Sequence, residues 1–504
     1  MLIGLEISHF SMLKAFSVGT TGEQLQSLRR KIELDTEVAE KAIEQGEEQR
    51  HNHTTATLSN SGTAEIETPF TSCPHAIQHL SAFIGRNATG KTAVFEALDF
   101  MADCVRYNVT VAAMIKGRKG IGHLRTFGES QPLTFVVHCL MPETAEVMTW
   151  TLRLDGDEYD RPLIVYESVT AFSCTKRYLE ELGIPGVRSF FKKGIKRYTE
   201  DRTYFVIEEG AGEVYNNGKM IPTKLIDWRR SALALYGNFA QYKQLAILAE
   251  YVSHWYYCRM GTPEEQQMPL LGVHEAYSSN PSSWKDSPGH KHLDVYARNV
   301  DNVLVSLKKQ EPETYRKIMA NISERMPGTR KLSRRQAIGA LSSSENKLFI
   351  ILLLLEDPQP RRLIMLENPD TGLFHDMVDD LGFAMRDYVV NNYPLNQLFF
   401  TTHNTMMIDS LRPEEVWHFV RCGDDFNCED DDYYEEDLYG FEREDSSFGG
   451  GLQDGQVNSN GETRAFCVAS SPIVKEMYQQ GVSLGSMWYS GHFNFSEKEG
   501  LLCT

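Results

Sequence analysis

Gly85-Arg-Asn-Ala-Thr-Gly-Lys-Thr92 is the stretch of this 504-residue chain that decides its fold. It fits the pattern G-x-x-x-x-G-K-[ST], with an apolar strand at 80–84 before it and a helix-forming run at 93–101 after it. In such a unit the glycines let backbone amides wrap around a phosphate, and the positive end of the helix dipole faces the anion. The pattern predicts a nucleotide-binding P-loop, in which Lys91 contacts the β- and γ-phosphates and the Thr92 hydroxyl binds Mg²⁺.

The whole loop is expected to hold the nucleotide. Its residues are Gly85, Arg86, Asn87, Ala88, Thr89, Gly90, Lys91 and Thr92.

Two later strands end in residues that suit the same site. An apolar run at 363–366 is followed by Glu367, a second predicted Mg²⁺ ligand. Another apolar run, 398–400, leads to His403, 36 residues after Glu367, where an imidazole suits contact with the γ-phosphate. A buried strand that happens to end in Glu, or a purely structural histidine, is the alternative for each motif taken alone.

A serine-rich segment, Leu341-Ser-Ser-Ser-Glu-Asn-Lys347, precedes a strongly apolar run at 348–355 that indicates a buried strand or helix core. If that run is a helix, its N-terminus is an anion site by the same amide and dipole argument. A simple helix cap formed by Ser344 or a neighbour is the alternative. The order of the four motifs along the chain favours the anion site.

This order and spacing resemble the ABC-type ATPase heads of the SMC, RecF and OLD group over most of the chain. More narrowly, the chain resembles bacterial OLD-like ATPases, labelled AAA, that lack an attached nuclease. The matching stretches are 2–10, 85–92, 293–304, 363–374, 399–404 and 481–488.

The resemblance implies an α/β fold, namely an ABC-type P-loop head with an antiparallel β subdomain and an inserted helical subdomain. It also implies a head-to-tail homodimer that holds two ATP molecules between its subunits. The P-loop of one subunit would face Ser342 and Ser343 of the other, and the loop Asp370-Thr-Gly-Leu373 would communicate across the interface. The predicted cofactors are ATP and Mg²⁺. The predicted catalytic residues are Lys91, Glu367, Asn368, Asp370 and His403.

Two departures from the family pattern favour a slow ATP-gated switch over a fast motor. The chain has Asn368 where the family has a second acid, and an amide cannot accept the proton of the attacking water. Asp370 is the candidate substitute. Ser344 stands where the signature has glycine, which adds a side chain at a place of close backbone approach.

Composition limits the remaining choices. The net charge is −18, of which residues 424–446 carry −11 through twelve acids and one base, so acidity elsewhere neither supports nor excludes contact with DNA. No apolar run is long enough for a membrane span, the N-terminus lacks the features of a signal peptide, and the nine cysteines lack a C-x-x-C pair. We therefore expect a cytoplasmic protein without a membrane partner.

The predicted organisation has five parts. They are 1–150 (the first part of the ATPase head, with a polar insertion at 22–74), 151–330 (a β and helical lobe), 331–420 (the second part of the head), 421–465 (an acidic, disordered loop) and 466–504 (a C-terminal segment). Short alternating runs between 133 and 215 predict antiparallel hairpins. The period of 223–257 predicts helix, and 293–326 predicts two helices.

Three functions follow from these observations. The leading hypothesis is a slowly hydrolysing, dimeric ABC-type ATPase that acts as sensor or regulator of a bacterial anti-phage defence system. By resemblance, it acts with a separate effector protein such as a nuclease, and a homodimer or higher oligomer is expected. The first alternative is a RecF-like DNA repair or recombination ATPase with DNA as its partner. The second is a nucleotide-binding scaffold that does not hydrolyse ATP, suggested by Asn368.

Overall fold

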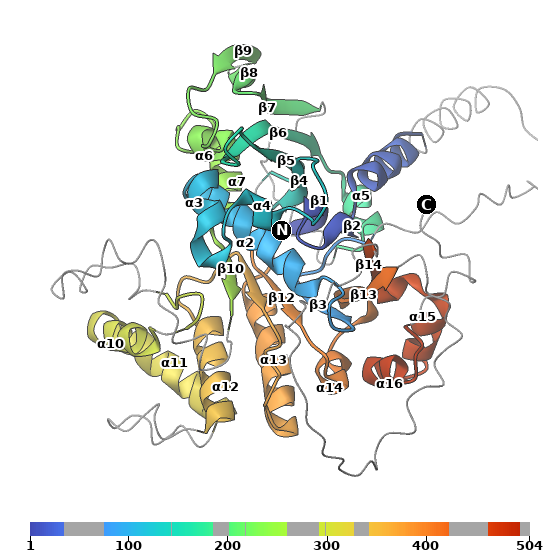
Figure 1. The fold of residues 1–504 in the computed structure, drawn as a ribbon. Coiled ribbons are helices and arrows are strands. Elements are labelled where there is room, and N and C mark those ends of the chain that lie inside the picture. The colour runs from blue at the N-terminus through green and yellow to red at the C-terminus, as the bar shows by residue number, and fades with distance from the viewer. Residues whose placement is uncertain are drawn as a thin grey trace, which may run out of the picture.

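The computed structural model describes residues 1–34, 75–142, 144–184, 201–216, 218–259, 292–297, 299–326, 342–422 and 462–493. It is a mixed α/β structure with two sheets (Figure 1). Of the predicted polar insertion at 22–74, residues 22–34 are described and helical. The acidic segment 424–446 lies outside the described residues.

The P-loop strand lies inside a six-stranded sheet with the order β10-β11-β12-β3-β13-β14. Its strands are β3 (Leu80–Gly85), β10 (Trp255–Cys258), β11 (Leu363–Leu366), β12 (Gln397–Thr401), β13 (Val416–Cys422) and β14 (Glu462–Cys467). All neighbours in this sheet are parallel except β13 and β14. Parallel strands end at a common edge, so the residues that follow β3, β11 and β12 meet there.

The second sheet has eight strands in the order β2-β1-β4-β5-β6-β7-β8-β9, and every pair is antiparallel. The strands are β1 (Leu2–Phe10), β2 (Leu13–Gly19), β4 (Leu133–Met141), β5 (Glu146–Gly156), β6 (Pro162–Ser173), β7 (Arg202–Glu208), β8 (Ala211–Asn216) and β9 (Lys219–Lys224). The predicted hairpins are thereby confirmed. The sheet also contains the two N-terminal strands, β1 and β2. Strand β5 spans residue 150, where the sequence predicts the boundary between the first two parts of the chain.

The six-stranded sheet is covered on both faces, as a largely parallel sheet requires. The helices on the side of the second sheet are α2 (Lys91–Arg106), α3 (Val109–Met114), α4 (Ile121–Leu124), α6 (Ala232–Gly237) and α7 (Lys243–Ser253). Those towards the other face are α10 (Val300–Gln310), α11 (Pro312–Arg325), α12 (Ser343–Leu355), α13 (His375–Asn391), α14 (Thr405–Asp409), α15 (Pro472–Gln479) and α16 (Leu484–Tyr489). The short helix α5 (Lys176–Glu181) packs in a third cluster with β1 and β4.

Alternation along the strands divides the core into two main clusters. On β3, Phe83 packs with α2 and the antiparallel sheet, whereas Ala82 and Ile84 pack with α12 and α13. The P-loop helix α2 is therefore buried between the two sheets, with thirteen of its sixteen residues buried. This burial fixes the direction of α2 and hence the direction in which its N-terminus points.

The helices predicted for three segments, 223–257, 348–355 and 293–326, can be compared with the structure. The predicted helical segment 223–257 is wrong at both ends, because β9 reaches Lys224 and β10 begins at Trp255. Trp255-Tyr-Tyr-Cys258 is a short, wholly buried run, which periodicity cannot assign, and its aromatic residues favour a strand. The apolar run 348–355 is helical, within α12. The two helices predicted within 293–326 are confirmed as α10 and α11.

Among the described residues, no helix has the length and apolar character needed to cross a membrane. Six cysteines fall in the described part of the chain, and each is a free thiol.

Candidate nucleotide-binding site

The path of the loop between β3 and α2 depends on two glycines. Gly85 has φ of 135°, and a Cβ there would lie 2.2 Å from the carbonyl oxygen of Phe419 on the neighbouring strand β13. Gly90 has φ of 92°, a left-handed conformation at the N-cap of α2. Side chains are disfavoured at both positions, so the loop conformation requires the glycines of the motif.

The N-terminus of α2 is suited to an anion. No side chain caps its first turn in the described residues, and that turn contains no acid. Its first amides and the positive end of its dipole are therefore left for another partner. Arg86, Asn87 and Ala88 are exposed, so the loop opens towards solvent. These features fit a bound phosphate group.

Lys91 lies inside the loop. Its ammonium donates to the carbonyl oxygens of Gly85 at 2.8 Å and Arg86 at 2.6 Å. Burial lowers the pKa of Lys91 to about 8, and the nearby Glu367 acts in the opposite direction. A phosphate at the loop would favour the charged form of Lys91 by the same Coulombic effect.

The Thr92 hydroxyl donates to Oε1 of Glu367 at 2.5 Å. This contact joins the first turn of α2 to the end of β11, two elements 275 residues apart in the sequence. A hydroxyl and a carboxylate side by side are the hard oxygen donors that Mg²⁺ prefers. The pair therefore fits the predicted magnesium site. Mg²⁺ bound there would neutralise charge on the β- and γ-phosphates.

His403 follows the end of β12 and is exposed. Its pKa is lowered first by partial burial and then by Lys91, while Asp370 acts in the opposite direction. The imidazole therefore lies near enough to Lys91 and Asp370 for their charges to affect its pKa. Asp370 is buried, which raises the pKa of its carboxyl group. Its Oδ1 has no hydrogen-bond partner among the described residues.

Asn368 adopts a left-handed backbone conformation, with φ of 42°, directly after Glu367. Asparagine tolerates this conformation better than most residues. Its backbone N–H donates to the Thr401 hydroxyl at 3.0 Å, and that hydroxyl donates to the side-chain oxygen Oδ1 of Asn368 at 3.3 Å. The side chain is therefore directed towards β12. It carries an amide at the position where the resembling family has an acid that could activate water.

The serine-rich start of α12 forms a helix cap. Ser342 is the N-cap, and it forms a reciprocal capping box with Glu345. The Ser344 hydroxyl donates to the carbonyl oxygen of Gly372, which ties the helix to the 370–373 loop. Ser342 and Ser343 are exposed. In the described part of this single chain, none of their hydrogen bonds reaches the P-loop.

Sequence reasoning missed two contributors to the site. The Tyr257 hydroxyl, at the end of β10, donates to the second carboxylate oxygen of Glu367. The Lys347 ammonium, on α12, donates to the carbonyl oxygens of Asn368 at 2.8 Å and Thr371 at 2.9 Å. Lys347 lies within the serine-rich segment and could have been found there. Tyr257 precedes Glu367 by 110 residues and belongs to no motif.

No family model matches the chain, and no curated protein matches it. Three solved structures similar to the chain are head domains of SMC proteins. An SMC head domain from Thermotoga maritima has 11% identity and a TM-score of 0.30, over 83% of this chain and 94% of that chain. An SMC head bound to the C-winged helix domain of ScpA has 11% identity and a TM-score of 0.33, over 83% and 93%.

The third is an Smc head domain with an extended coiled coil, bound to the C-terminal domain of ScpA derived from Pyrococcus furiosus. It has 10% identity and a TM-score of 0.35, over 95% of this chain and 99% of that chain.

Proposed function

We propose that the chain binds ATP with Mg²⁺ in the loop between β3 and α2. The observation that carries this proposal is the hydrogen bond between Thr92 and Glu367, which brings two oxygen groups suited to Mg²⁺ together beside a helix N-terminus without a side-chain cap. Lys91 and the loop amides bind the phosphates, and His403 contacts the terminal phosphate. When bound, Mg²⁺ supplies charge neutralisation during phosphoryl transfer.

Hydrolysis is slow in this proposal because Asn368 cannot take a proton from water. Asp370 is the acid that could replace it as the base, and burial raises the pKa of its carboxyl group. A scaffold that binds ATP without hydrolysing it is the second candidate function, favoured by the same asparagine.

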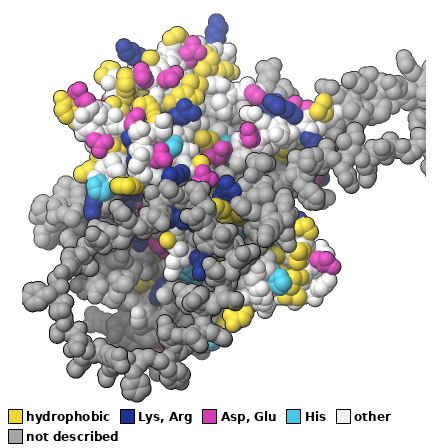
Figure 2. Space-filling view, turned by 45° about the vertical axis from the view of Figure 1, so that its right-hand side comes forward, with side chains coloured by type: hydrophobic (Ala, Val, Ile, Leu, Met, Phe, Trp, Pro, Cys, Tyr) yellow, Lys and Arg dark blue, Asp and Glu magenta, His cyan; other side chains and the backbone are white. Residues whose placement is uncertain are grey.

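Two copies of the chain enclose the nucleotide in this proposal. Ser342 and Ser343 of one copy would approach the P-loop of the other, which accords with their exposure and with the absence of P-loop contacts in one described chain. By the motif resemblance, the dimer senses or regulates a bacterial anti-phage response through a separate effector such as a nuclease. On the face shown in Figure 2, basic and acidic side chains of the described residues are interspersed.

The test compares wild type with Lys91→Ala in nucleotide binding and phosphate release. Loss of a charge-assisted contact of about 1.5–3 kcal/mol corresponds to roughly 10–150-fold weaker binding of a fluorescent ATP analogue. The exposed Lys309 on α10 provides the matched control, and Lys309→Ala should bind as wild type does. Equal affinity of wild type and Lys91→Ala would contradict the proposed site. Binding that depends on Lys91, without any phosphate release, would identify the scaffold.

The defence role has its own test, in which the chain is expressed with its genomic neighbours and purified. We expect an effector to co-purify and phage resistance to depend on Lys91. Degradation of DNA by the chain alone would contradict a separate effector, and ATP-strengthened, salt-dependent DNA binding without an effector would favour the RecF-like alternative.

A further inference from the structure

We propose that Tyr257 is a positioning residue for the magnesium site: its hydroxyl holds the carboxylate of Glu367 so that the opposite oxygen faces Thr92, with which it would hold Mg²⁺. This inference rests on the proposed function. It assigns a role to a residue that no sequence motif indicates.

Glu367 is held by two hydroxyl groups, one on each carboxylate oxygen. Thr92 donates to Oε1 from α2, and Tyr257 donates to Oε2 from β10. Tyr257 has no exposed surface, so its hydroxyl needs a partner within the protein, and Glu367 supplies it. Rotation of the carboxylate away from Thr92 would break a buried hydrogen bond.

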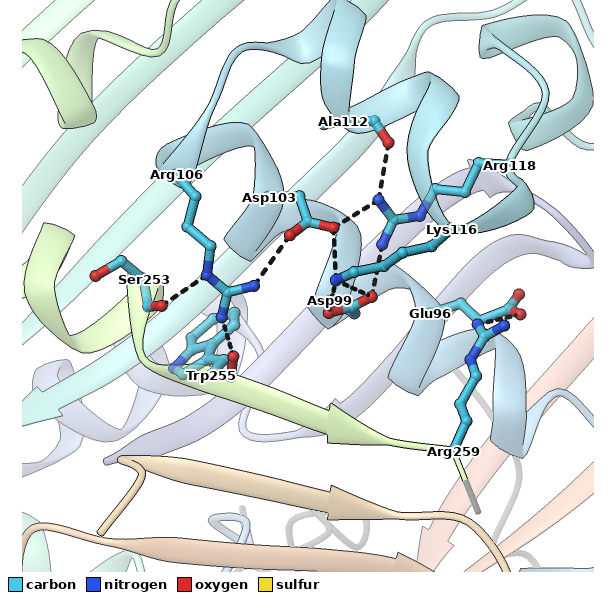
Figure 3. A network of polar contacts seen from close by, with 10 residues as sticks. All are labelled: Glu96, Asp99, Asp103, Arg106, Ala112, Lys116, Arg118, Ser253, Trp255 and Arg259. Atoms are coloured by element: carbon cyan, nitrogen blue, oxygen red, sulfur yellow. Dashed lines mark hydrogen bonds and ion pairs between the residues drawn. The ribbon is translucent and has the colours of Figure 1, made fainter. Parts of the chain in front are cut away.

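The ring of Tyr257 is fixed from two sides. Phe95 of α2 meets it edge-on, with ring centroids 5.7 Å apart. The guanidinium of Arg259 lies 4.7 Å from its centroid. Arg259 also forms a 2.8 Å ion pair with Glu96, four residues after Thr92 on α2 (Figure 3). The tyrosine and the threonine that hold Glu367 are therefore tied to one another through α2.

The beginning of β10 is attached to α2 as well. Figure 3 shows Arg106, near the end of α2, donating to the backbone carbonyl oxygens of Ser253 at 2.8 Å and of Trp255. The ion pair with Asp103, at 3.0 Å, holds the Arg106 guanidinium in place. Contacts at both ends of β10 thus fix the position of this strand relative to α2. Tyr257, which belongs to β10, thereby fixes the position of the Glu367 carboxylate.

Mg²⁺ requires near-ideal octahedral geometry at short distances, so a freely rotating carboxylate is a poorer ligand than a fixed one. Residues that orient metal ligands commonly contribute 10–100-fold to metal affinity. Removal of the Tyr257 hydroxyl should therefore weaken the response to Mg²⁺ and leave metal-free nucleotide binding unchanged.

The neighbouring residue on β10 is a matched control. Tyr256 is also a buried tyrosine with a bonded hydroxyl, but it faces the opposite side of the sheet and donates to the carbonyl oxygen of Asp294 at 2.6 Å. Tyr256→Phe therefore removes a hydroxyl from the same strand without touching Glu367.

The experiment titrates Mg²⁺ into full-length protein with a fluorescent ATP analogue and repeats the binding in EDTA. For Tyr257→Phe we expect the half-saturating Mg²⁺ concentration to rise roughly tenfold, with affinity in EDTA as in wild type. Tyr256→Phe should match wild type in both. In a Glu367→Gln background, Tyr257→Phe should cause no further change in the Mg²⁺ response.

An unchanged Mg²⁺ response in Tyr257→Phe would overturn the inference, as would an equal rise in Tyr256→Phe, because the effect would then be one of strand packing. An additive effect in the Glu367→Gln background would also overturn it. Failure of the wild type to bind the nucleotide would instead refute the proposed function. The two failures are therefore distinguishable.

Discussion

At the scale of single residues, the Glu367–Asn368 pair sets what the site can do. Glu367 is engaged by hydroxyl groups on both oxygens and suits a metal ligand. The Asn368 side chain accepts a hydrogen bond from Thr401, but an amide is not basic enough to take a proton from water. In the proposed function Glu367 therefore serves as a metal ligand, whereas position 368 offers no carboxylate to activate water.

The substitution Asn368→Asp should increase ATP turnover. Aspartate retains an acceptor for the Thr401 hydroxyl and tolerates the left-handed backbone, and it adds a carboxylate that can accept the proton of water. General-base catalysis contributes about 10²–10⁴-fold where geometry is favourable, so we expect a rise of at least roughly tenfold. Steady-state phosphate release measures it.

The control for this substitution is Asn238→Asp, which makes the same chemical change at an exposed residue after α6. It should leave turnover as in wild type. If Asn368→Asp is no faster than wild type, the asparagine does not limit hydrolysis, and Asp370 becomes the candidate base.

At the scale of elements, three hydrogen bonds join α12 to the loop after β11. Lys347 donates to two carbonyl oxygens of that loop, and Ser344 donates to a third. The helix that would face a partner's nucleotide is thus bonded to the loop that carries Asn368 and Asp370. Movement at either place is expected to reach the other through these bonds.

Lys347→Met should loosen the loop while keeping most of the apolar length of the side chain. Hydrogen bonds to charged groups contribute about 1.5–3 kcal/mol, so unfolding free energy should fall by about 1–3 kcal/mol in urea denaturation. Amides 368–373 should exchange faster in hydrogen-exchange mass spectrometry. Lys309→Met, on the exposed side of α10, should change neither quantity. Unaltered exchange in the loop of Lys347→Met would show that the bonds to Lys347 do not hold it.

At the scale of the whole molecule, a buried glutamine links the two sheets at the start of β12, the end of the strand opposite to His403. The side chain of Gln397 on β12 accepts from the backbone N–H of Leu2 at 2.6 Å and donates to its carbonyl oxygen at 2.9 Å. The Tyr251 hydroxyl donates to the same glutamine at 2.8 Å. Because α2 lies between sheets joined in this way, its position relative to both sheets is fixed. The exposed start of α12 is where the proposed second copy would bind.

Dimerisation should require ATP and the exposed serine at the start of α12. We expect mass photometry to show dimers of the wild type with ATP and Mg²⁺ and monomers without them. Ser343→Arg places a bulky charge at the proposed interface, so it should remain monomeric while binding ATP within about twofold of wild type. Ser490→Arg, at an exposed serine after α16, should dimerise normally. ATP-dependent dimers of Ser343→Arg would contradict the proposed arrangement.

The residue patterns within short segments were sufficient to predict the loop at 85–92, the strands that end before Glu367 and His403, and the antiparallel hairpins. Each of these is a local matter, since glycine conformations, apolar alternation and polar residues at strand ends are set by neighbours in the chain. Periodicity could not assign the short strand β10, although its aromatic residues favour a strand. Its four buried residues become a strand through parallel pairing with β11, more than 100 residues later.

The sequence by itself determined a G-x-x-x-x-G-K-T motif at 85–92, a candidate Mg²⁺ ligand in Glu367 and an amide at position 368. The tertiary structure decided what holds those groups in place: Tyr257 on Glu367, and Lys347 on the loop that follows it. The physical reason is that a hydrogen bond between distant segments depends on sheet order and helix burial, which no local pattern encodes.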